Sequence, residues 1–170
     1  MASEARSAEG WVTELMRSYR DRLLGGLYEG IYRLEGEPLR QLMDAQAETC
    51  VSAFVALMDI PADLDFESFL ERMRISGPSQ IRIERTGPDA LLWTEVHRGE
   101  CVCPYVRQGV IRLDPKLCLC GETWVRLLVE RHARRRARVS LVESVATGAE
   151  NCVYRVELGE PLPQRPGSSR

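Results

Sequence analysis

The chain has 170 residues, 44% of them hydrophobic and 28% charged, an ordinary composition for one soluble domain with a core of its own. Lys and Arg number 23 against 25 Asp and Glu, so the net charge of −2 gives no electrostatic case for nucleic acid or an anionic membrane as a partner. The first residues lack an apolar signal segment, and no stretch reaches the roughly 18 apolar residues of a membrane span, so we expect a cytoplasmic protein.

The first half of the sequence is predicted to be helical. Apolar residues recur at helical spacing from about Glu9 to Leu24, and Gly25-Gly26 is expected to interrupt that helix. A second helix is predicted after Gly36-Glu37-Pro38, and Cys50 falls on its apolar face, where we expect a small buried thiol. A third, shorter helix is predicted from the spacing of Phe66, Phe69, Leu70 and Met73.

From Gln80 the apolar period changes to two, which predicts strands in place of helices. Ile81 and Ile83 alternate with charged residues, and the turn Gly87-Pro88-Asp89 leads into a second apolar run at 91–96. We therefore expect a β-hairpin over residues 80–96, continued by the segment that follows it.

Four of the six cysteines lie within twenty residues, in two Cys-x-Cys pairs: Cys101 with Cys103, and Cys118 with Cys120. Side chains two apart on an extended strand point to the same face, so each pair can present two sulfurs together. A strand at 110–113 followed by a turn would fold the second pair back toward the first. Clustered thiolates suit zinc or an iron–sulfur cluster, and one activated thiolate suits covalent catalysis; the residues leave these alternatives open.

Two further strands are predicted at 137–145 and 151–158, after a helix that begins at Gly121. On the first of them Glu143 shares a face with apolar side chains, and a buried carboxylate needs a cation, a metal, hydrogen-bond donors or a proton. Glu143 is therefore either functional, paired with an arginine, or displaced by a bulge. His97, at the end of the hairpin, is either an exposed strand-end residue or a proton carrier, if its strand turns it inward.

A basic run from Arg131 to Arg138 closes the predicted helix, and we interpret it as a solvated helix end. No aromatic residue is interleaved with these arginines to stack bases, so the prediction is that the protein does not bind nucleic acid. Residues 159–170 have no apolar period and are expected to form a disordered tail. The remaining 1–158 are predicted to be one domain, with a helical part at 9–75 and a sheet-rich part at 80–158.

The second half of the sequence carries a family likeness over roughly residues 80–158. The residues that carry it are the two cysteine pairs with Pro104 and Gly121-Glu122-Thr123-Trp124, and then 139–154 with Glu143 and Cys152. These residues resemble the C-terminal half of L-2-amino-thiazoline-4-carboxylic acid hydrolase-like proteins. They are more distantly similar to the 4-vinyl reductase-type small-molecule-binding domains of bacteriochlorophyll synthesis and aromatic-sensing regulators. The resemblance implies an α+β fold: N-terminal helices, then an antiparallel sheet with one long helix packed across it, enclosing a small-molecule pocket.

The more distant resemblance also implies a zinc site. In the vinyl reductase-type sensors zinc is held by a cysteine before the long helix, a glutamate in the next strand, a cysteine three residues later, and a cysteine that begins the last strand. Cys120, Glu143 and Cys152 match the first, second and fourth positions, but Ala146 stands at the third. The expected ligands are therefore Cys118, Cys120 and Cys152, completed by Glu143 or Cys103, with an iron–sulfur cluster as the less favoured cofactor.

From the closer resemblance we expect a small-molecule enzyme of the thiazoline hydrolase-like group. A cysteine thiolate or a metal-bound water would attack an sp² carbon of a small sulfur or nitrogen compound. Cys103 is the expected nucleophile, with Glu143 as general base and His97 as proton carrier. The alternative is a non-catalytic domain that binds a metal and a small molecule as a sensor or carrier. The expected partner is a small-molecule ligand or substrate, a homodimer is possible, and no membrane is expected.

Overall fold

The computed structural model describes residues 8–75 and 80–163, and its first half is helical, as predicted. The first helix does not end at Gly25-Gly26 but continues to Ile31. A Cβ at position 25 would stand only 2.9 Å from the carbonyl oxygen of Val110. Glycine therefore lets this helix and the segment around Val110 approach closely, which offsets its cost within a helix. The helices of this half are α1 (Ala8–Ile31), α2 (Gly36–Leu57) and α3 (Phe66–Ile75).

The second half contains a four-stranded antiparallel sheet, so the α+β prediction is confirmed. The predicted hairpin forms from the first two strands, and the C-terminal strand lies next to the second of them, giving the order β1-β2-β4-β3. The strands are β1 (Gln80–Gly87), β2 (Ala90–Val96), β3 (Arg135–Glu143) and β4 (Cys152–Pro161).

The segment between β2 and the next helix does not continue the sheet. Among the described residues no strand forms at 110–113; the segment instead carries the short helix α4 (Pro104–Arg107) and the 3-10 helix η1 (Pro115–Leu117). Asp114 caps η1 by accepting a hydrogen bond from the backbone N–H of Lys116, which makes this segment turn rather than extend. A second 3-10 helix, η2 (Val145–Thr147), connects β3 to β4.

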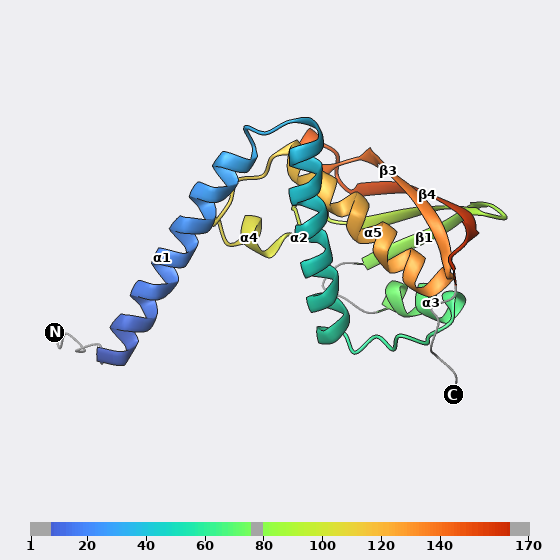
Figure 1. The fold of residues 1–170 in the computed structure, drawn as a ribbon, viewed down its shortest axis with the longest axis horizontal. Coiled ribbons are helices and arrows are strands. Elements are labelled where there is room, and N and C mark those ends of the chain that lie inside the picture. Colours follow the sequence, from blue (N-terminus) through green and yellow to red (C-terminus); the bar gives the residue numbers. More distant parts are fainter. Residues whose placement is uncertain (1–7, 76–79, 164–170) are drawn as a thin grey trace.

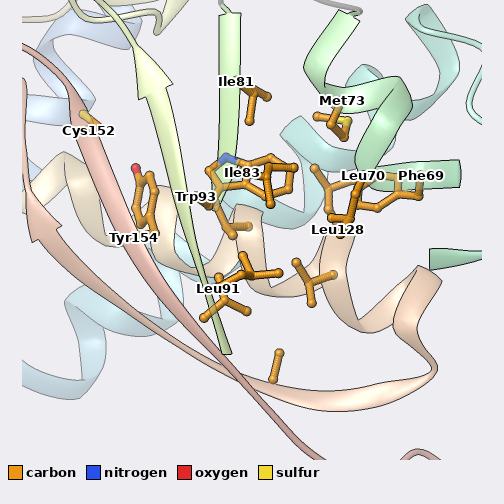
Figure 2. Close-up of a cluster of buried hydrophobic side chains, with 14 of the residues drawn as sticks. Phe69, Leu70, Met73, Ile81, Ile83, Leu91, Trp93, Leu128, Cys152 and Tyr154 are labelled. Carbon is orange, nitrogen blue, oxygen red and sulfur yellow. The ribbon is translucent and has the colours of Figure 1, made fainter. Parts of the chain in front are cut away.

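The long helix α5 (Cys118–Ala133) packs across the sheet and encloses the main core. Figure 1 shows α5 lying across the sheet. The core between them is fully buried and includes Leu91, Trp93 and Val156 from the sheet, with Leu128 of α5 and Phe69 of α3. Figure 2 labels four of these side chains: Leu91, Trp93, Leu128 and Phe69. In Figure 2 the apolar side chains of β1, β2 and α3 converge on one side of the sheet, which is the face that α5 covers. The sheet therefore has one covered apolar face.

The termini of the strands differ from the predictions in two places. Arg135 begins β3, so the basic run from 131 to 138 is divided between the last turn of α5 and a strand. β4 extends to Pro161, so residues 159–161 belong to the sheet and not to a tail, while 164–170 lie outside the described residues. No helix among the described residues is long and apolar enough to cross a membrane.

Candidate functional site

The four clustered cysteines do not lie on strands. Cys101 and Cys103 are in the coil before α4, and Cys118 and Cys120 are in the first turn of α5. Successive helical residues are rotated by about 100°, so two side chains two apart point to nearly opposite sides of a helix. The expectation that each pair presents its sulfurs together is therefore wrong for Cys118 and Cys120, and α5 separates these two thiols.

Cys118 faces the end of the sheet. Its sulfur lies 2.9 Å from the hydroxyl oxygen of Ser144, which is 1% exposed at the start of η2. Burial raises the pKa of the Cys118 thiol; the Ser144 hydroxyl offsets this, and a thiolate at Cys152 would add to it. Cys101 is on the same side, and burial raises its pKa to about 11, reinforced by repulsion from neighbouring thiolates. Cys101 and Cys118 are thus predominantly protonated thiols at neutral pH.

Cys120 faces the helical half. It packs with Cys103 against the second hydrophobic cluster, which includes Tyr28 of α1 and Tyr32 in the turn after that helix. Burial raises the pKa of Cys120 strongly, and thiolates at Cys103 and Cys50 would raise it further. Cys50 itself is exposed on α2, contrary to the prediction of a buried thiol, because α2 turns other residues inward: Leu39, Met43, Ala47 and Val51.

The predicted zinc ligands are not brought together. Among the described residues, 8–75 and 80–163, no group of three or more His, Cys, Asp or Glu side chains is arranged to hold a metal. Glu143, predicted on the buried face of its strand, is exposed because the register of β3 against β4 shifts between Leu141 and Glu143. In the described structure Cys118, Cys120, Cys152, Glu143 and Cys103 therefore do not form a metal-binding group, and zinc binding stays a prediction.

A different arrangement lies at the end of β2 and the start of β4. Glu95 and Cys152 are direct partners in the β2–β4 ladder, and His97 follows two residues after Glu95. His97 Nε2 lies 3.0 Å from a carboxylate oxygen of Glu95, and the side chains of His97 and Glu95 are 1% and 12% exposed. Cys152 is 7% exposed (Figure 2), and the backbone N–H of His97 donates to the Asn151 side chain at 3.0 Å. Of the two alternatives for His97, the structure shows the inward one.

The electrostatics link these three residues. Burial lowers the pKa of His97, but the Cys152 thiol and the Glu95 carboxylate raise it more, to about 9. His97 Nε2 contacts the Glu95 carboxylate, whereas Nδ1 is buried and has no hydrogen-bond partner among the described residues. With this pKa, His97 is a buried cation at neutral pH, beside the Glu95 carboxylate and the Cys152 side chain.

A hollow of about 300 Å³ opens beside this group. It lies where β1 begins and β2 ends, and Arg98 and Glu100 of the turn after β2 form part of its wall. In this turn Arg98 and Gly99 have φ angles of 54° and 84°. Of the three residues of this group, His97 lines the hollow, whereas Glu95 and Cys152 do not. Its lining residues are Gln80, Val96, His97, Arg98, Glu100, Val102 and Arg107.

Glu95 was missed by the sequence reasoning, which searched for a buried carboxylate on β3. The signal was present in the hairpin, since Trp93 and Glu95 share a face of β2 and His97 continues their alternation one residue after the strand ends. A carboxylate and an imidazole two residues apart, on the face of a tryptophan, predict a buried pair. That Cys152 stands opposite could not be read from spacing, because the pairing of β2 with β4 joins segments far apart in the chain.

No protein-family model matches this sequence, and no curated relative matches it. Among solved structures, the fold is similar to trafficking protein particle complex subunit 3 from Naegleria fowleri, covalently bound to palmitic acid. The identity is 11%, over 92% of this chain and 93% of that one, with a TM-score of 0.48. It is also similar to an H-NOX protein from S. oneidensis in the Fe(II)NO ligation state, at 15% identity over 94% and 80% of the two chains, with a TM-score of 0.45. Similarity at this level assigns neither family nor function.

Proposed function

We propose that the protein is a small-molecule hydrolase of the thiazoline-carboxylate hydrolase-like kind, with Cys152 as nucleophile, His97 as its proton carrier and Glu95 as the residue that orients His97. The observation that supports this is the Glu95–His97 hydrogen bond of 3.0 Å directly beside Cys152. Covalent catalysis of this kind requires a nucleophile, a base within reach of it and a third group that orients the base. The substrate class is a small cyclic amidine, thioester or related sulfur or nitrogen compound.

The reaction needs two steps. The thiol proton of Cys152 resides on His97, and the sulfur forms a bond to the sp² carbon of the substrate. As the bond from that carbon to nitrogen or sulfur breaks, His97 gives its proton to the leaving atom. His97 then takes a proton from water, whose oxygen attacks the thioester-like intermediate. The carbon–sulfur bond breaks, and Cys152 is released as a thiolate beside the protonated His97. Glu95 stays ionised throughout and holds the ring by accepting from Nε2.

Cys152 is a better nucleophile than Cys103, the residue expected from the sequence, because of where the histidines lie. The chain has two histidines. His132 is stacked on Phe69 with ring centroids 4.2 Å apart and lies 3.1 Å from the carbonyl oxygen of Leu64, so it is a packed core residue. His97 remains as the base, and Cys152 is the thiol that interacts with it.

The test is a turnover assay with an activated thioester and with a cyclic amidine such as 2-amino-thiazoline-4-carboxylate. Intact mass spectrometry of the quenched reaction would detect the covalent intermediate. Cys152→Ser should abolish both the adduct and turnover, while the matched control Cys103→Ser should retain them. Loss of activity in the Cys103 variant with activity retained in the Cys152 variant would refute the assignment. Absence of any adduct or turnover would favour the non-catalytic binding domain.

Zinc binding stays a prediction from the distant resemblance, and the catalytic steps above do not depend on it. Elemental analysis of protein purified without added metal tests it directly. One equivalent of zinc per chain would require the thiols around α5 to rearrange relative to the described structure, whereas metal-free protein with freely titrating thiols agrees with that structure.

A further inference from the structure

The hollow at the end of β2 carries an excess of positive charge. Besides the imidazole of His97, its charged lining residues are Arg98, Arg107 and Glu100. The charge of His97 is balanced by the Glu95 carboxylate, 3.0 Å away, so the two arginines supply the unbalanced charge. The chain as a whole has a net charge of −2, so this excess is local to the hollow.

Neither arginine is held firmly by the rest of the chain. The guanidinium of Arg98 has no hydrogen-bond or ion-pair partner among the residues that the structure describes. Arg107 lies 3.7 Å from a carboxylate oxygen of Glu100, and these two side chains are 54% and 78% exposed. An ion pair this exposed is weak, so a bound anion could displace Glu100 into solvent.

The backbone at Arg98 is strained. Its φ of 54° lies in the left-handed region, which side chains with a Cβ disfavour. The turn is fixed in this form, because the Gly99 N–H donates to the Glu150 carbonyl at 2.8 Å and the Glu100 N–H donates to the His97 carbonyl at 3.1 Å. Packing does not explain an arginine here, since its side chain is exposed and a glycine would adopt the same φ without strain. Strained residues of this kind cluster at ligand-binding sites.

We propose that the hollow binds a small organic oxyanion, a carboxylate or a phosphate monoester, through the guanidinium groups of Arg98 and Arg107. A guanidinium donates two parallel N–H groups to either kind of anion. The volume of about 300 Å³ is at the lower end of the range for small-molecule pockets, so it suits a ligand of few atoms. Val96 and Val102 provide an apolar wall for the carbon skeleton of that ligand.

The anion site and the proposed hydrolase can be tested separately. Arg98 and Arg107 take no part in the catalytic steps, and Cys152 does not line the hollow. Anion binding is measured without turnover, so the failure of either proposal leaves the other standing.

NMR titration of the full chain in phosphate-free buffer tests the site. The probes are benzoate, phenyl phosphate and benzamide, and benzamide is the neutral control with nearly the shape of benzoate. We expect at least one of the two anions to shift the backbone amide signals of Arg98 and Gly99 saturably, while benzamide leaves them unchanged. The anion with the lower Kd identifies which oxyanion the hollow prefers. No shift with either anion, or equal shifts with benzamide and benzoate, would refute the proposal.

Variants separate binding from folding. Arg98→Gly removes a guanidinium and relieves the strained φ, so the Kd of the preferred anion should rise at least about tenfold while the urea midpoint stays level or increases. Arg107→Gln should weaken binding similarly, and Glu100→Gln should strengthen it several-fold, because the competing carboxylate is gone. Arg138→Ala is the matched control: Arg138 is exposed on β3, at the opposite edge of the sheet from β1, and its variant should bind like the native chain.

Two outcomes of this variant series would also overturn the proposal. One is an Arg98→Gly protein that binds the anion as tightly as Arg138→Ala does. The other is a Glu100→Gln protein that binds it more weakly than the native chain, since this would make Glu100 part of the binding group and not its competitor.

Discussion

The buried His97 makes the stability of this protein depend on pH in a window that can be calculated. The pKa of His97 rises from 6.5 to about 9 on folding: burial opposes the rise, and Cys152 and Glu95 outweigh it. A group whose folded pKa is raised contributes stability that is fully present below its unfolded pKa and is lost as pH rises through the folded one. The contribution of His97 is therefore complete below pH 6.5 and disappears by about pH 9.

The magnitude follows from the same two values. Each pH unit over which the folded state alone holds the proton is worth about 1.4 kcal/mol, so the window from 6.5 to about 9 amounts to about 3 kcal/mol in the free energy of unfolding. The side chain of His97 is 1% exposed, so solvent does little to screen its interaction with Glu95. Urea unfolding at intervals from pH 6 to 9.5, on the native chain and on His97→Gln, measures it as the difference between the two curves.

The other histidine provides the control. Burial lowers the pKa of His132, so its contribution is present above pH 6.5 and is lost as pH falls below that value. The native curve minus the His132→Gln curve should therefore be flat from pH 6.5 to 9. If the His97→Gln difference is also flat over that window, the buried imidazole is neutral and the account of the Glu95–His97–Cys152 group is refuted.

Two further predictions concern the fold and the surface. Gly121→Ala should lower the free energy of unfolding by about 1–3 kcal/mol, because the added Cβ would overlap the hydroxyl of Tyr154, which is 3% exposed and cannot move aside. Urea denaturation measures this change, and an unchanged midpoint would contradict the packing of α5 on β4. The arginines at 131–138 should give no tight, salt-sensitive binding to a fluorescent oligonucleotide at physiological salt. They are divided between a helix end and a strand, and Arg135 is paired with Asp89, at 2.5 Å, and donates to the Gly159 carbonyl. A submicromolar Kd in fluorescence anisotropy that rises with salt would show the prediction to be wrong.

Periodicity predicted the elements whose packing is local. The period of 3.6 found α2 and α3, and the period of two found the hairpin and the alternation of Cys152, Tyr154 and Val156 on β4, because those apolar faces are buried as their patterns imply. Gly25 was misjudged because its cost within a helix is offset by a tertiary contact with Val110, which no local pattern reveals.

The site could be predicted only in part, for two physical reasons. Cys118 and Cys120 were assigned to a strand although they begin a helix, and a change of period from two to 3.6 separates side chains that the strand would have paired. A bulge after Leu141 then turned Glu143 outward, and a bulge leaves no mark in the apolar pattern. His97 and Cys152 were identified individually, but their juxtaposition depends on strand pairing.

The most direct test of the central claim is the rate at which each cysteine reacts with iodoacetamide in the native protein near neutral pH. Digestion and tandem mass spectrometry give separate time courses for Cys152, which is 7% exposed, and for Cys50, which is exposed on α2. Burial alone would make Cys50 the faster thiol. A thiolate supported by His97 should make Cys152 faster than Cys50, and His97→Gln should slow Cys152 at least about tenfold without changing Cys50. A Cys152 that remains unmodified until urea unfolds the chain would contradict the proposed role.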